Sequence, residues 1–194
     1  MPPDMPVTSL VFDPAPVAVV GTVLGLLQNT PLLVPGVAVA LVVAVAVAPS
    51  AATRTGLSPP LAGMLVFAFG AILAITLTPG SGEGFFGRSW CGGLRPPPRL
   101  GQLLSLSSEH GLNVAMFVPL GVLVGLIPRV RPFAAALLVA GAMPLVIEWI
   151  QYSVPRLDRI CQTWDAIENL MGLAIGLGIG VAVSFALRAA RRTA

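Results

Sequence analysis

Charged residues are scarce in this chain. Only 10% of its 194 residues are Asp, Glu, Lys or Arg, whereas 56% are hydrophobic. Soluble proteins carry about 25% charged residues. Together with a mean hydropathy of +0.90, this composition excludes an ordinary soluble domain. It predicts an integral membrane protein, and the partner that it implies is the lipid bilayer that surrounds the helices.

Lysine is absent, so all 11 basic residues are arginines, and the formal net charge is +3. No basic face or stripe gathers these arginines, so no nucleic-acid partner is expected. We interpret the positive charge as a determinant of membrane topology instead. The first 13 residues contain two acids and no base. They do not match the basic region of a secretory signal, so this segment is expected to remain in the mature protein.

Cysteine and histidine are equally rare. Cys91 and Cys161 are the only cysteines, and neither belongs to a CxxC motif or a Cys/His ligand set. His110 is the only histidine, and we expect it to form a local hydrogen bond without a catalytic role. The sequence therefore predicts neither a metal site nor a cofactor.

Long apolar runs dominate the rest of the chain. A spanning helix needs about 20 mostly apolar residues, and residues 31–52, 60–78, 111–127 and 170–187 meet that requirement. Residues 132–152 make a fifth span, which Pro144 is expected to kink because proline lacks the backbone N–H. The shorter run 15–27 predicts an interfacial or re-entrant helix, with a sixth span as the alternative. The expected fold class is therefore all-α: a polytopic membrane helical bundle with about five transmembrane helices plus this short N-terminal helix.

The chain divides into an N-terminal segment (1–30), the bundle (31–187) and a basic tail (188–194). Arg54, Arg129, Arg131 and the tail occupy the places that the positive-inside rule assigns to the cytoplasm. The N-terminus and the connections 79–110 and 153–167 are then expected outside. Cys91 and Cys161 both fall in these outer connections, where disulfides persist, so a disulfide between them is predicted.

A group of polar residues lies where the last two predicted spans meet. Glu148 and Gln151 are three residues apart, and Asp165 and Asn169 are four apart, so each pair shares a helix face. Arg159 lies between the pairs as a natural counter-ion. A charge at membrane depth costs about 2.5–3.5 kcal/mol and marks a functional site by default. The alternatives are a carboxylate solvated near the head groups, or a hydrogen-bond network that locks two helices together.

Two features leave alternatives open, one in the third span (111–127) and one shared by the third and last spans. Asn113 either caps the helix or donates a hydrogen bond to the polar group near Glu148. Small-xxx-small patterns permit close packing of helices, either within one chain or between two. The glycines in these patterns are Gly121, Gly125, Gly172, Gly176 and Gly180.

These residues resemble the VanZ-like family of bacterial membrane proteins over about residues 76–180. The motifs that carry the resemblance are Asn113, Phe117-Val118-Pro119-Leu120-Gly121, Glu148-xx-Gln151, Arg159, and Asp165-xxx-Asn169-xx-Gly172 with Gly176. Family members often carry an acid three residues after the arginine, where this chain has Gln162. A role for two acids in that connection therefore does not carry over.

The resemblance implies a multi-pass protein of the cell membrane with an outward-facing polar site. The family takes its name from a glycopeptide-resistance cluster, whose member lowers sensitivity to teicoplanin, a lipoglycopeptide that acts on cell-wall precursors. A role in such resistance or in other envelope processes is implied, with a lipid-linked cell-wall precursor or a glycopeptide as partner. The implied site residues are Asn113, Glu148, Gln151, Arg159, Asp165 and Asn169.

Catalysis is left open by the sequence. One alternative is an enzyme acting on a lipid-linked envelope substrate, with Glu148 or Asp165 as base. The other is a membrane scaffold or small transporter, in which the polar cluster is architecture. The sequence predicts no oligomeric state.

Overall fold

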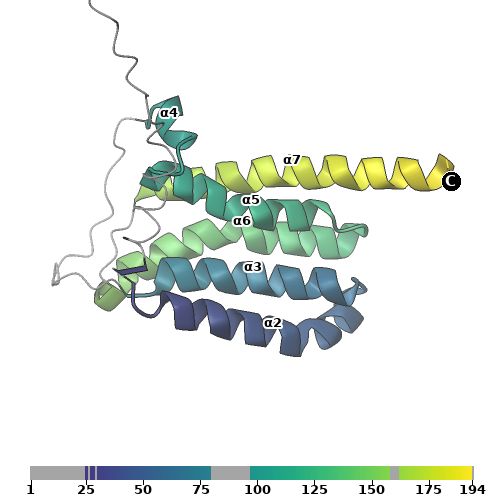
Figure 1. The fold of residues 1–194 in the computed structure, drawn as a ribbon, viewed down its shortest axis with the longest axis horizontal. Coiled ribbons are helices and arrows are strands. Elements are labelled where there is room, and N and C mark those ends of the chain that lie inside the picture. Colours follow the sequence, from purple (N-terminus) through teal and green to yellow (C-terminus); the bar gives the residue numbers. More distant parts are fainter. Residues whose placement is uncertain (1–24, 26, 29, 80–96, 158–161, 194) are drawn as a thin grey trace, which may run out of the picture.

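The computed structural model describes residues 25, 27–28, 30–79, 97–157 and 162–193. Within them the chain forms helices and no strand (Figure 1). The elements are α2 (Leu33–Thr55), α3 (Pro59–Leu77), α4 (Leu100–Leu103), α5 (Glu109–Gly125), α6 (Val130–Ser153), the short 3-10 turn η1 (Pro155–Leu157) and α7 (Thr163–Thr193).

Four of these helices, α2, α3, α6 and α7, are long and apolar enough to cross a membrane. Helix α5 is apolar too, but its 17 residues make it shorter. The predicted all-α membrane bundle is therefore confirmed, with four long candidate spans and one shorter apolar helix. The predicted N-terminal helix, residues 15–27, lies almost entirely outside the described residues.

Two helices begin earlier than the apolar runs suggest. Helix α7 begins at Thr163 rather than near residue 170, because Asp165 lies in its first turn, where a helix favours negative charge. Helix α5 begins at Glu109, and the Ser108 hydroxyl oxygen accepts a hydrogen bond from the Gly111 backbone N–H at 3.0 Å. Ser108 is thus the N-cap, and Asn113 lies within the helix.

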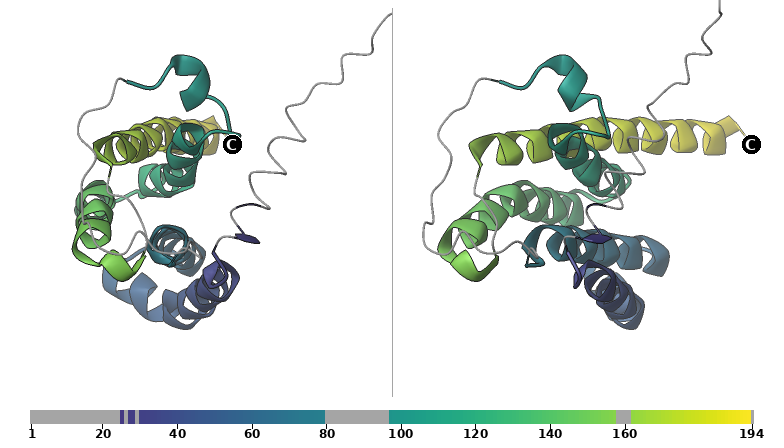
Figure 2. Two further views of the ribbon diagram at one scale, coloured as in Figure 1. Left: turned by 90° about the vertical axis from the view of Figure 1, so that its left-hand side faces the viewer. Right: turned by 60° about the vertical axis from the view of Figure 1, so that its left-hand side comes forward.

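The bundle consists of two helix pairs joined by α6. Figures 1 and 2 show α2 beside α3 on one side and α5 beside α7 on the other. The buried core lies between α3, α5 and α6, with Leu173 contributed by α7. Phe117, Leu120 and Val124 of α5 are fully buried there. Outward-facing side chains such as Val45 and Leu138 are apolar and exposed, as expected of a surface that contacts lipid.

The two ends of the bundle differ in charge. At one end, called here the polar end, α5 and α7 begin and α3 and α6 finish, and all four acids in the described part of the chain lie there. At the opposite end, called the arginine end, lie the turns α2–α3 and α5–α6 and the last turns of α7 (Figure 1). That end carries Arg54, Arg129, Arg131, Arg188, Arg191 and Arg192.

Glycines allow α5 and α7 to pack backbone against backbone. A Cβ on Gly172, Gly176 or Gly180 would overlap a carbonyl oxygen of α5, that of Val114, Val118 or Val122 respectively. The two helices run parallel, and each of these contacts joins residues 58 apart in the chain. The small-xxx-small faces are therefore used within the monomer.

Candidate functional site at the polar end

Glu168 is the central residue of the polar end. Its side chain is fully buried, yet both carboxylate oxygens have partners on α5. The imidazole Nδ1 of His110 lies 2.6 Å from Oε1, and the Asn113 amide donates to Oε2 at 3.1 Å. His110 and Asn113 are three residues apart on one helix face. Two consecutive polar positions on that face thus bind one carboxylate.

The helix register explains this meeting. His110 and Glu168 are 58 residues apart, the same separation that joins Gly172 to Val114 and Gly176 to Val118. The α5–α7 contact face therefore continues one turn before Gly172, the first glycine of this stripe, and ends at the His110–Glu168 pair. Close backbone packing brings the two polar side chains within hydrogen-bonding distance.

Asp165 lies one turn before Glu168 on α7. Asn113, Glu109, His110 and Glu168 lie close enough to Asp165 to interact with it electrostatically. The hydrogen bond from Asn113 to Glu168 follows the alternative in which Asn113 is a hydrogen-bonding group of the cluster.

Glu148 joins the cluster from α6. Its side chain is only 8% exposed, and its Oε2 accepts a hydrogen bond of 2.7 Å from the backbone N–H of Gln162, just before α7. Asp165 is close enough to interact with it electrostatically. At the position of Gln162, where relatives often carry an acid, this chain thus binds Glu148 through a backbone N–H.

The remaining predicted site residues lie in different places. Gln151 donates to the carbonyl oxygen of Thr76 at 3.0 Å, which ties α6 to α3. Asn169 is 2% exposed, and its Oδ1 has no hydrogen-bond partner among the described residues. Arg159, Cys91 and Cys161 lie outside the described residues, so the proposed counter-ion and the disulfide stay predictions.

Sequence reasoning missed two functional candidates: Glu168, and His110 as the hydrogen-bond partner of Glu168. The sequence motif indicates Asp165 and Asn169 rather than Glu168, and it predicts only a local hydrogen bond for His110. The signal was present in the spacing, since Glu168 precedes Gly172 by four residues, just as Gly172 precedes Gly176. Extending the glycine stripe by one turn reaches Glu168.

The chemistry available at this end is that of a carboxylate–imidazole pair. With a hydrogen on Nδ1, His110 donates to Glu168, and its Nε2 is left as an acceptor. The His110 side chain is 31% exposed whereas Glu168 is fully buried, so the imidazole is the accessible member of this pair. In the described part of the chain, no three His, Cys, Asp or Glu side chains are placed to hold a metal ion.

Comparison with known proteins agrees with this architecture. The model of the VanZ/LLP1 family matches residues 14–184, which is most of the chain. No curated protein and no solved structure matches this chain. The candidate spans and the family match together make this a multi-pass membrane protein. The chain belongs to the VanZ/LLP1 family.

Proposed function

We propose that the polar end binds the polar head group of an envelope molecule at the outer face of the membrane. The observation that carries the proposal is the buried Glu168, which is held by His110 and Asn113. A fully buried carboxylate is costly unless it is paired, and buried ionisable groups commonly belong to a functional site. The Oδ1 of Asn169, which has no hydrogen-bond partner among the described residues, supports the same view, because a buried polar atom is usually paired.

The proposal includes a topology. We place α5 as a fifth span, residues 1–30 as an external segment with a short helix, residues 31–187 as the bundle and residues 188–194 as a cytoplasmic tail. The gathering of six arginines at one end supports this orientation. The Cys91–Cys161 disulfide belongs to the same proposal, since both cysteines then lie outside.

Reporter fusions check the orientation. Fusions after Arg54 and after Arg192 are expected to score cytoplasmic, and a fusion near Arg95 is expected to score external. The physical reason is that arginines in short connections are retained on the cytoplasmic side. An external score after Arg192 would contradict both the orientation and an outward-facing site.

The biological role that we propose is reduced sensitivity to teicoplanin-type glycopeptides or a related envelope process. Expression of the chain in a susceptible bacterium is expected to raise the minimum inhibitory concentration of teicoplanin. Glu168→Gln removes the charge and keeps the side-chain shape, and it is expected to abolish this increase without lowering the amount of protein in the membrane. Glu109→Gln is the matched control, because Glu109 is exposed and lies in the same turn as His110.

The outcomes of this experiment separate the hypotheses. Loss of resistance with Glu168→Gln at an unchanged membrane level supports a functional site. A fall in protein level alone, with resistance proportional to the remaining protein, indicates that the cluster is architectural, as in a scaffold. No effect of the wild-type chain on teicoplanin sensitivity would refute the glycopeptide role.

A second candidate function is favoured by the His110–Glu168 pair. A carboxylate that orients an imidazole is a recurring arrangement in general acid–base catalysis. The substrate would be a lipid-linked envelope molecule. His110→Gln is expected to preserve binding of such a molecule and abolish turnover if the chain is an enzyme, whereas a binding protein would lose affinity instead.

A further inference from the structure

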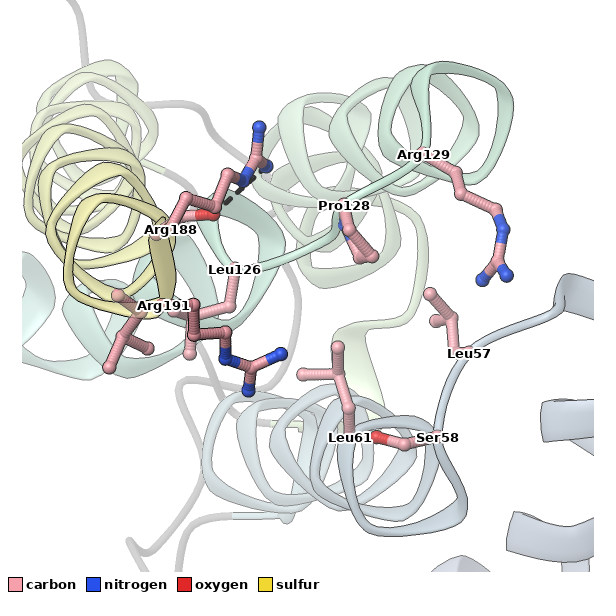
Figure 3. A pocket seen from close by; sticks show the side chains of 10 residues that line it. Leu57, Ser58, Leu61, Leu126, Pro128, Arg129, Arg188 and Arg191 are labelled. Carbon is pink, nitrogen blue, oxygen red and sulfur yellow. Dashed lines mark hydrogen bonds between the residues drawn. The ribbon is translucent and has the colours of Figure 1, made fainter. Parts of the chain in front are cut away.

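The arginine end contains a cleft that the polar site does not involve. It measures about 370 Å³, within the roughly 300–1,000 Å³ of small-molecule sites. Its walls come from the start of α3, the α5–α6 turn and the end of α7 (Figure 3). The lining comprises the apolar residues Leu57, Leu61, Leu126, Pro128 and Leu187, and the polar residues Ser58, Arg129, Ser184, Arg188 and Arg191.

The three arginines of the cleft differ in their partners. Arg129 donates to the carbonyl oxygen of Gly56. Arg188 donates to the Ser184 hydroxyl at 3.1 Å and lies over the Phe185 ring at 5.8 Å. Arg191 forms neither a hydrogen bond nor an ion pair with any described residue. Figure 3 shows its guanidinium pointing toward Leu61 on the opposite side of the cleft, so it is available to an anion there.

The charges around the cleft are of one sign. Every acid in the described part of the chain lies at the polar end, so none of those carboxylates neutralises these arginines. A second cavity of about 590 Å³ shares Arg129 and adds Arg54 and Arg131. Arginines grouped at low-dielectric walls attract anions.

Membrane depth restricts what kind of anion can reach the cleft. Residues 170–187 of α7 are uncharged and extend about 27 Å at 1.5 Å per residue. That length is close to the roughly 30 Å of a bilayer hydrocarbon core. Arg188 is the first charged residue beyond it, so Arg188 and Arg191 lie at the level of the lipid head groups.

We propose that this cleft binds one anionic phospholipid. Arg191 and Arg188 hold its phosphate through charge-assisted hydrogen bonds, and Leu57, Leu61 and Leu126 contact the upper part of an acyl chain. Basic pockets between membrane helices take anionic head groups by the same chemistry. The proposal does not rest on the function of the polar end, nor on which side of the membrane the arginine end faces.

The test uses the full-length chain in a neutral detergent, which has no charged surface of its own. Native mass spectrometry measures the retention of phosphatidylglycerol and of phosphatidylcholine when both are added in equal amounts. The wild type is expected to retain phosphatidylglycerol preferentially. Arg191→Gln is expected to weaken that binding about tenfold, the effect of losing one hydrogen bond between charged groups. Arg188→Gln, a second variant, is expected to weaken it in the same direction.

Arg192→Gln is the matched control, because it removes the same charge one residue further along α7 and does not line the cleft. Unchanged binding in this control supports a defined site. An equal loss with Arg191→Gln and Arg192→Gln would overturn the proposal and indicate only general attraction. Equal retention of phosphatidylcholine by the wild type would also overturn it. Displacement of the lipid by inorganic phosphate at matching concentration would assign the cleft to a soluble anion instead.

Discussion

Glu168→Ala is expected to lower the free energy of unfolding by about 3 kcal/mol. The substitution removes both hydrogen bonds to α5, and a hydrogen bond to a charged group contributes about 1.5–3 kcal/mol. The hydrogen bond to His110 contributes less than this range, because the His110 side chain is 31% exposed and solvent screens the interaction. The partly buried amide of Asn113 also loses its Glu168 partner. Titration with SDS in mixed micelles, followed by circular dichroism, measures the change.

Glu109 provides the control for this prediction, because it lies in the same turn of α5 as His110. Glu109→Ala removes an exposed carboxylate beside His110 and is expected to cost less than about 1 kcal/mol, the usual value of an acid at a helix N-terminus. A double-mutant cycle with His110→Ala isolates the energy of the His110–Glu168 pair. An equal cost for Glu109→Ala and Glu168→Ala would show that the buried position of Glu168 has no energetic importance.

The lengths of the apolar runs predicted the four long membrane helices and the shorter α5. Apolar runs of about 20 residues in a chain with 10% charged residues permit little besides membrane helices. The glycine spacing also predicted a close helix contact, and the structure places it between α5 and α7. The apolar runs did not predict where α7 begins, because its first turns are polar and belong to the site rather than to the span.

Residue spacing predicted shared faces but not partners. Glu148 and Gln151 are separated by three residues on α6, yet Glu148 binds the main chain before α7 and Gln151 binds that of α3. Residues three apart on a helix point about 60° apart, since each residue turns the helix by about 100°. In a bundle, that angle is enough to direct two side chains toward different neighbours.

The pairing of Glu168 with His110 required the register between two helices. No local pattern relates residues 58 apart, and a lone histidine carries little information by itself. The register becomes apparent only once the glycines of α7 are placed against the α5 backbone. Packing geometry, rather than local sequence, therefore determines which acid becomes the buried centre of the polar end.

Gly176→Ala is expected to lower the free energy of unfolding by about 2–3 kcal/mol, the upper range for overpacking a close contact. The added Cβ would overlap the carbonyl oxygen of Val118, which is main chain and cannot rotate away. The control is Gly178→Ala, two residues along the same helix, where nothing lies within 4 Å of the new methyl group. Alanine there is expected to be neutral or to stabilise α7 by up to about 1 kcal/mol, because it favours the helix more than glycine does.

The same substitution also tests whether packing holds the polar site together. If the glycine face holds α5 against α7, separating the helices at Gly176 lengthens the His110–Glu168 contact two turns away. Part of the energy of that pair is then already lost in Gly176→Ala. The double variant Gly176→Ala/Glu168→Ala is therefore expected to lose less stability than the two single changes added together. Strict additivity, or equal costs for Gly176→Ala and Gly178→Ala, would show that the polar pair forms independently of the glycine contact.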